Sequence, residues 1–200
     1  MLDHVFLDAI GAVRRSLEDA LLERHAFEER FQIDVLLGDA TWETSYTLPG
    51  EGMVARVAVE IDLDWPTWSQ TAWRSWSIGE PVEDPPQILL QLTLRLARLA
   101  SRPDPAQILS VLPDSGPDLT GDALERGHIT IEEHIEPEGG SFAVEVPYEG
   151  TYDIDDQLAE KGTATDGLAV LGPWIASRLV SLADLELPYL PPDPVDDIGR

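Results

Sequence analysis

The feature that most constrains the fold is a two-residue alternation of apolar and mostly polar residues over residues 53–65. In this segment, MVARVAVEIDLDW, apolar side chains fall on alternate positions and charged residues fill most of the others. A two-residue period is typical of a strand with one buried face. The preceding segment WETSYTL alternates in the same way, and the turn PGEG (49–52) separates the two. The sequence therefore predicts an antiparallel hairpin, with one face of its first strand formed by Trp42, Thr44, Tyr46 and Leu48.

Three segments carry the spacing of helices. Apolar residues recur at three- and four-residue steps over residues 2–30, which predicts a long amphipathic helix. A second helix is predicted over residues 87–100 and ends before Pro103. Leucine and isoleucine surround this second helix almost completely, so we expect it to be buried or shared with a second copy of the chain. A third helix is predicted around residues 167–183.

The remaining strands complete an α+β domain. Residues 70–78 are predicted to form a third strand, and residues 128–148 a second hairpin that turns at residues 137–140. Strand runs joined by short turns, with helices between them, indicate an antiparallel sheet of about five strands with helices packed on it, in the order α-β-β-β-α-β-β-α. We expect a single domain over residues 1–183 and a proline-rich acidic tail over residues 184–200.

The charge of the chain disfavours several classes of function. Its 38 acidic and 13 basic residues give a net charge of −25, which repels nucleic acids and anionic membranes. The acidity either serves solubility alone or favours a basic partner. The chain has no cysteine, which excludes disulfides and thiolate sites. The start, MLDHVFLDAI, lacks the basic region of a secretory signal, and no apolar run is long enough to span a membrane. We expect a cytoplasmic protein.

Tryptophan is concentrated in one short segment. WPTWSQTAWRSW, residues 65–76, holds four of the six tryptophans in the chain. On the predicted strand Trp73 and Trp76 point to opposite faces. Trp76 then fits the core, while Trp73 lies among hydroxyl side chains, with Trp68 nearby, as an aromatic platform for a partner. The alternative is that Trp73 is also buried within its own fold.

Arginine residues provide a second candidate contact. Arg95, Arg98 and Arg102 step along one stripe of the predicted helix over residues 87–100 and just beyond its end. In an acidic chain this positive stripe either binds a carboxylate-bearing partner or pairs with neighbouring acids.

No pattern for catalysis or metal binding emerges from the sequence. The four histidines are too far apart along their predicted elements for a pair to bind one metal ion. Glu132 and His134 share a strand face but lack a third ligand. The acidic run at residues 153–156 lacks the glycine and the final glutamate of a calcium loop. We therefore predict no catalytic residue, no metal site and no cofactor, and expect that the protein is not an enzyme.

The predicted element order is similar to that of bacterial type III secretion effector chaperones and related peptide-binding chaperone-like domains. The resemblance covers residues 2–183 in element order. Proteins of that kind are small, acidic, cytoplasmic and commonly dimeric. The resemblance implies a fold that binds an extended client segment on sheet and helix surfaces. It also implies a homodimer through the second helix, here residues 86–102.

Three functional hypotheses follow. The leading one is a non-enzymatic, chaperone-like module that binds a protein or peptide, with candidate contacts at Trp68, Trp73, Arg74, Arg95, Arg98 and Arg102. The second is an acidic inhibitor or immunity-type protein that blocks a basic partner, which predicts acids clustered on one surface. The third is an enzyme of unrecognised type.

Overall fold

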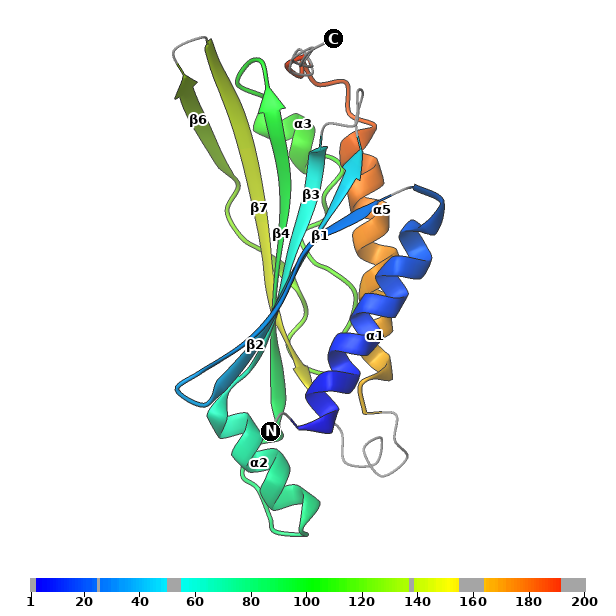
Figure 1. The fold of residues 1–200 in the computed structure, drawn as a ribbon, viewed down its shortest axis with the longest axis vertical. Helices are drawn as coiled ribbons and strands as arrows, with labels where there is room; N and C mark the ends of the chain where they lie inside the picture. The colour runs from blue at the N-terminus through cyan, green and yellow to red at the C-terminus, as the bar shows by residue number, and fades with distance from the viewer. Residues whose placement is uncertain (1–2, 25, 50–54, 137–138, 155–163, 192–200) are drawn as a thin grey trace, which may run out of the picture.

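The computed structural model shows an α+β fold built on one antiparallel sheet (Figure 1). The residues that it describes are 3–24, 26–49, 55–136, 139–154 and 164–191. The strands in this part of the chain are β1 (Phe27–Leu36), β2 (Asp39–Pro49), β3 (Ala55–Trp65), β4 (Gln87–Leu99), β5 (Glu125–Arg126), β6 (Thr130–Glu136) and β7 (Gly139–Asp153). The helices there are α1 (His4–Leu21), α2 (Thr67–Ser77), α3 (Pro105–Leu109) and α5 (Leu171–Ala183), with 3-10 turns η1 (Leu22–Arg24) and η3 (Asp166–Val170).

The seven strands form a single sheet in the order β1-β2-β3-β4-β7-β5, and β6 pairs with β7 beside β5. All the pairings are antiparallel. The strand β1 therefore lies at one edge of the sheet, while β5 and β6 form the other edge. The predicted α+β class and antiparallel sheet are confirmed, but the sheet is larger than the predicted five strands and the element order differs in detail.

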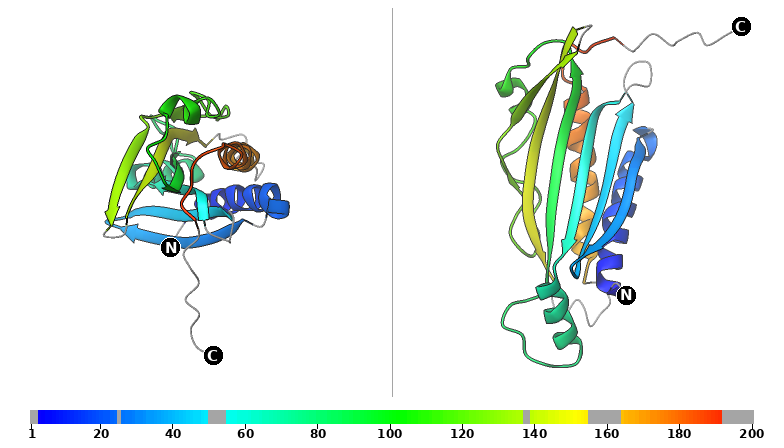
Figure 2. Two further views of the ribbon diagram at one scale, coloured as in Figure 1. Left: turned by 90° about the horizontal axis from the view of Figure 1, so that it is seen from above. Right: turned by 60° about the vertical axis from the view of Figure 1, so that its left-hand side comes forward.

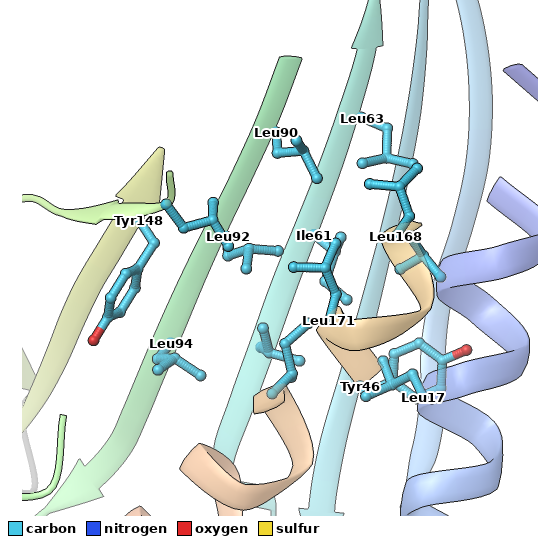
Figure 3. Packing of buried hydrophobic residues seen from close by; sticks show 14 of the residues in the cluster. Leu17, Tyr46, Ile61, Leu63, Leu90, Leu92, Leu94, Tyr148, Leu168 and Leu171 are labelled. Carbon is cyan, nitrogen blue, oxygen red and sulfur yellow. The ribbon is translucent and has the colours of Figure 1, made fainter. Parts of the chain in front are cut away.

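One face of the sheet is covered by α1, α5 and η3. Viewed from above, the sheet bends around α5, and α1 lies beside α5 (Figure 2). In the buried cluster, Leu171 of α5 lies beside Ile61 of β3, and Leu17 of α1 lies beside Tyr46 of β2 (Figure 3). Both leucines and Ile61 are completely buried. The alternation seen in the sequence thus supplies the sheet side of the core.

Helices α1 and α5 pack in close contact at Gly172. A Cβ atom added to this glycine would lie 2.2 Å from the backbone carbon of Ser16 in α1. A contact this short with backbone leaves no room for a larger residue. Glycine at this position is therefore what allows the two helices to approach, and their layer depends on it.

The segment predicted as the second helix is instead the central strand β4. Ile88, Leu90, Leu92 and Leu94 are all buried, with partly exposed residues between them. Leucine dominates this run, and it satisfies a helical spacing as readily as a two-residue spacing. The homodimer predicted through a helix at residues 86–102 has no such helix to form it. Most of this segment is the strand β4, which is hydrogen-bonded to β3 on one side and to β7 on the other.

Two other predicted elements also differ from the structure. The first helix ends at Leu21, not at residue 30, and residues 27–30 belong to the strand β1. The predicted third strand over residues 70–78 is instead part of the helix α2, on which Trp73 and Trp76, three residues apart, lie side by side.

The two predicted hairpins and the last helix are confirmed. β2 pairs with β3, β6 pairs with β7, and η3 with α5 covers the segment predicted over residues 167–183. The two turns predicted at residues 49–52 and 137–140 fall largely outside the described residues. Of the predicted tail, residues 184–191 are described, and Tyr189 forms an isolated backbone bridge with Leu99.

Candidate protein-interaction surface

The turn between β1 and β2 carries two exposed leucines. Leu37 and Gly38 form this two-residue turn, and their φ angles are 53° and 100°. Glycine adopts such angles freely, whereas a leucine with positive φ is a strained exception. Leu36 is 74% exposed and Leu37 is 96% exposed. We call Leu36 and Leu37 the apolar tip, and it contributes almost nothing to the core of its own chain.

Helix α2 braces the apolar tip through hydrogen bonds. The Asp39 carboxylate accepts from the backbone N–H of Thr67 at 2.6 Å and from its hydroxyl at 2.7 Å. These bonds hold the pKa of Asp39 below its usual value. The buried amide of Gln70 donates to the carbonyls of Gly38 at 2.6 Å and Trp65 at 2.8 Å. These contacts therefore hold the turn in one position.

The tryptophans of residues 65–76 lie differently from the predicted strand arrangement. Trp65 ends β3, is completely buried, and stacks on Phe6 with ring centroids 6.2 Å apart. Trp73 and Trp76 do not diverge, because both sit on α2 and their rings meet edge to face at 6.3 Å. Both are partly buried against the core, so the predicted division into a core Trp76 and an exposed Trp73 is wrong.

Trp68 is the indole of α2 that stands exposed. Its side chain is 48% exposed, and it directly follows Thr67, which binds Asp39 beside the apolar tip. Arg74 is held on the same helix by internal contacts, donating to the carboxylate of Asp3 at 3.1 Å and to the side chain of Gln70 at 3.0 Å. Arg74 therefore fastens α2 to the beginning of α1.

The three arginines predicted as a stripe do not form one. Arg95 lies on β4 between Glu60 at 3.7 Å and Glu145 at 3.5 Å, so its charge is compensated within the sheet. Arg98 donates to the backbone carbonyl of Pro191 at 3.1 Å. Arg102 follows the strand and is exposed. Helix α2 stands at the start of β4 and these arginines lie toward its end, so the predicted contact residues are divided between distant places (Figure 1).

The edge strand β1 presents an apolar row next to the tip. Phe31, Ile33 and Val35 pair with Thr44, Trp42 and Ala40 of β2, which places all three on the helix-covered side of the sheet. The strand runs away from α1 towards the tip (Figure 1), so the cover ends before the row does. Phe31 is 49% and Val35 is 62% exposed. The row begins at Phe31, whose ring meets Trp42 edge to face and carries the guanidinium of Arg14 at 5.0 Å.

Four carboxylates gather on the open face of the sheet. Glu43 on β2 lies directly opposite Asp62 on β3, and Glu60 and Asp64 follow on the same side of β3. Burial, followed by the charges of Glu43, Asp64 and Glu60, raises the pKa of Asp62 to about 6. Arg30 of β1 forms an ion pair with Glu43. We call these four carboxylates the acidic row. Three of them, Glu43, Glu60 and Asp62, line a hollow of about 280 Å³ together with Arg30, Thr44 and Ser45.

A larger hollow of about 920 Å³ lies between β4, β7 and residues 122–128. His128 lines it, but Arg126, also in its wall, is engaged by Asp114 and by the carbonyl of Leu112. His134 lies elsewhere, 3.8 Å from Glu132. In the described part of the chain, no three histidine or acidic side chains are grouped so that they could hold a metal ion. The apolar tip is therefore the more distinctive surface.

The chain matches no protein-family model, no curated protein and no solved structure, so its function is argued from its own residues. Among the described residues, no helix combines the length and apolar character needed to cross a lipid bilayer.

Trp68 was predicted as a contact residue from the sequence, but the apolar tip was not. The sequence marks the tip as LLGD (36–39), in which a glycine and an aspartate follow two leucines. It marks a hairpin turn, but the spacing of apolar residues does not show whether the leucines are buried.

Proposed function

We propose that the protein is a non-enzymatic module that binds a partner protein or peptide through the apolar tip and Trp68. The observation that carries this proposal is the exposure of Leu36 and Leu37 on a turn that α2 holds in place. Scattered exposed apolar residues are ordinary, but adjacent ones on a braced turn are suited to insertion into a partner. Because the turn is fixed beforehand, binding costs little ordering entropy.

The charge of the chain favours a basic partner over an acidic one. A net charge of −25 disfavours acidic partners at long range and accelerates encounter with basic ones. A chaperone-like role, as in the secretion chaperones that the predicted element order resembles, is the form of this proposal in which the partner is a client polypeptide. Trp73 and Arg74 support the surface by holding α2 to the core and to Asp3.

A second candidate is an acidic inhibitor that covers a basic site on another protein. The acidic row favours it, since Glu43 and Asp62 face each other across neighbouring strands and would be relieved by a cationic group. The two candidates differ in their response to salt. Binding through the acidic row weakens steeply as ionic strength rises, whereas binding through the apolar tip retains most of its strength.

Selection of peptides from a random library on the immobilised full-length protein tests the leading proposal. We expect the selected peptides to combine lysine or arginine with large apolar residues. The double variant Leu36→Ser/Leu37→Ser should bind them at least about thirtyfold more weakly, because two buried leucines each contribute more than 1 kcal/mol. Ile135→Ser is the matched control, since Ile135 is 83% exposed on β6, and its affinity should change less than about twofold.

Equal binding by the double variant and the wild-type protein would contradict this proposal, as would a library from which no peptide is enriched. Urea unfolding of each variant separates a loss of binding from a loss of folding. Both variants should keep their free energy of unfolding within about 0.5 kcal/mol, because they alter exposed side chains.

A further inference from the structure

The outer side of β1 offers a regular template for another strand. Among the described strands, β1 pairs with β2 alone. Its residues Phe31–Leu36 match Asp39–Thr44 one to one, and the register shift lies earlier, between Glu28 and Arg30. Sheet edges are commonly protected by lysine, proline, inward charges or bulges. The segment Phe31–Leu36 contains a single charged residue, Asp34, and Arg30 directly precedes it.

The two faces of this edge are complementary to different side chains of an added strand. On the helix-covered side a neighbouring strand would meet the apolar row of Phe31, Ile33 and Val35. On the open side it would meet Gln32 and Asp34, with Glu43 of the acidic row on the next strand. Side chains alternate between the faces of a strand. A strand that fits both faces therefore alternates apolar and basic residues.

Charge separates such a partner from a second copy of the chain. Pairing two β1 edges would bring together two chains of net charge −25, each with an acidic row near the contact. A basic strand instead places its cations beside Asp34, which is in register with Thr41 of β2 and Asp64 of β3. The charge of Arg30, at the start of the same edge, is already taken up by Glu43. The edge is thus complementary to a cationic partner.

We propose that a segment of the partner adds to the sheet as a strand along Phe31–Leu36, with apolar residues beside the apolar row and lysine or arginine on the open face. This inference rests on the proposed function and specifies how the same partner is held. Backbone hydrogen bonds supply affinity in this mode of recognition, and the alternate side chains supply specificity. In this arrangement the end of the bound segment contacts the apolar tip.

A nine-residue fluorescent peptide that alternates valine and arginine is the probe. We expect it to bind the full-length protein and to slow amide hydrogen exchange over residues 31–36. Two further peptides carry N-methyl groups, one on its valines and the other on its arginines. Because alternate residues of a strand direct their N–H groups to opposite edges, one methylated peptide should bind at least about tenfold more weakly and the other within about twofold.

Matched lysine substitutions test the location. Val35→Lys and Ile135→Lys each add one positive charge at an exposed aliphatic position, on β1 and β6 respectively. We expect Val35→Lys to weaken binding of the unmethylated peptide at least about tenfold, because the lysine places a charge beside the peptide's valines and interrupts the apolar row. Ile135→Lys should change the affinity less than about twofold, and urea unfolding verifies that both variants fold.

Several results would overturn strand addition. They are the absence of binding at millimolar peptide, equal affinity of both methylated peptides and the parent, or equal weakening by the two lysine variants. A dimer in sedimentation that Val35→Lys dissociates would show that a second copy occupies the edge. The library selection with the Leu36→Ser/Leu37→Ser variant judges the proposed function separately, so the tip can remain a binding surface when the strand does not form.

Discussion

The two edges of the sheet differ in how they meet solvent. On β6, three glutamates and a histidine occupy a strand of seven residues, Thr130–Glu136. On β1, the regular stretch Phe31–Leu36 has one charged residue and leads into the apolar tip. Charged side chains on an edge discourage pairing with other chains. Charge therefore protects β6 along its length, whereas on β1 it is concentrated at residues 28–30 and is sparse over Phe31–Leu36.

The hairpins that end at these edges also differ in their support. The turn of the β1–β2 hairpin is bound to α2 through Asp39 and Gln70. The exposed isoleucine of β6, Ile135, pairs with Gly140 of β7 at the far end of its hairpin. The position of Leu37 is fixed by the contacts of its turn with α2. Ile135 lies opposite Gly140, which has no side chain to pack against it.

The largest expected effect concerns the helix layer that both edges share. Gly172→Ala should lower the free energy of unfolding by about 3 kcal/mol, because its methyl group would meet the backbone of Ser16. Amide hydrogen exchange should then accelerate at β1 and β6 alike. Gly11→Ala is the control, since its methyl group meets the flexible end of Arg15, and helix propensity favours alanine by about 1 kcal/mol. Equal stability of the two variants would refute the close contact of α1 with α5.

An intermediate effect should fall on the β1 side alone. Gln70→Ala removes the two hydrogen bonds to the carbonyls of Gly38 and Trp65, and we expect a loss of about 1–2 kcal/mol in the free energy of unfolding. Exchange at residues 36–39 should become faster while that of β6 stays unchanged. If both hairpins respond equally, the proposed difference in support between them is wrong.

The smallest effect concerns the acidic row. The pKa of Asp62 is raised from 3.8 to about 6 in the folded protein, so the native state binds more protons than the unfolded chain between these pH values. The free energy of unfolding therefore falls as the pH rises through this window, and the cost is complete above about pH 6. Asp62→Asn should be more stable than the wild-type protein by about 1 kcal/mol at pH 7, after allowance for partial solvent exposure.

Below about pH 4 the stability advantage of Asp62→Asn should disappear, because the native aspartic acid is then neutral as well. Glu133→Gln on β6 removes one negative charge from an exposed position at the opposite edge. Urea unfolding of both variants across this pH range distinguishes a local effect of the acidic row from a general effect of net charge. An equal gain in both variants would indicate the general effect.

Strands with one buried face could be predicted from the sequence, because alternation depends on local geometry alone. β2, β3 and the β6–β7 hairpin were found in this way. The strand β4 was missed because leucines occupy both buried and partly exposed positions, so that neither period stands out. The strand β1 was missed in part because Phe27 continues the spacing of the preceding helix. In both cases tertiary pairing decided what the local pattern left ambiguous.

The candidate site was harder to predict than the fold. The exposed Trp68 was anticipated as a contact residue, although its position on a helix was not. Whether Leu36 and Leu37 are buried depends on which elements cover the end of the β1–β2 hairpin, and in the structure both leucines stay exposed. The local spacing of apolar residues does not contain this information.

The left-handed backbone of Leu37 has a consequence for how this turn is maintained. A glycine at residue 37 would relieve a conformational cost of about 1 kcal/mol, so selection for folding alone favours the smaller residue. The leucine side chain at this position is 96% exposed, so burial within its own chain does not offset the cost.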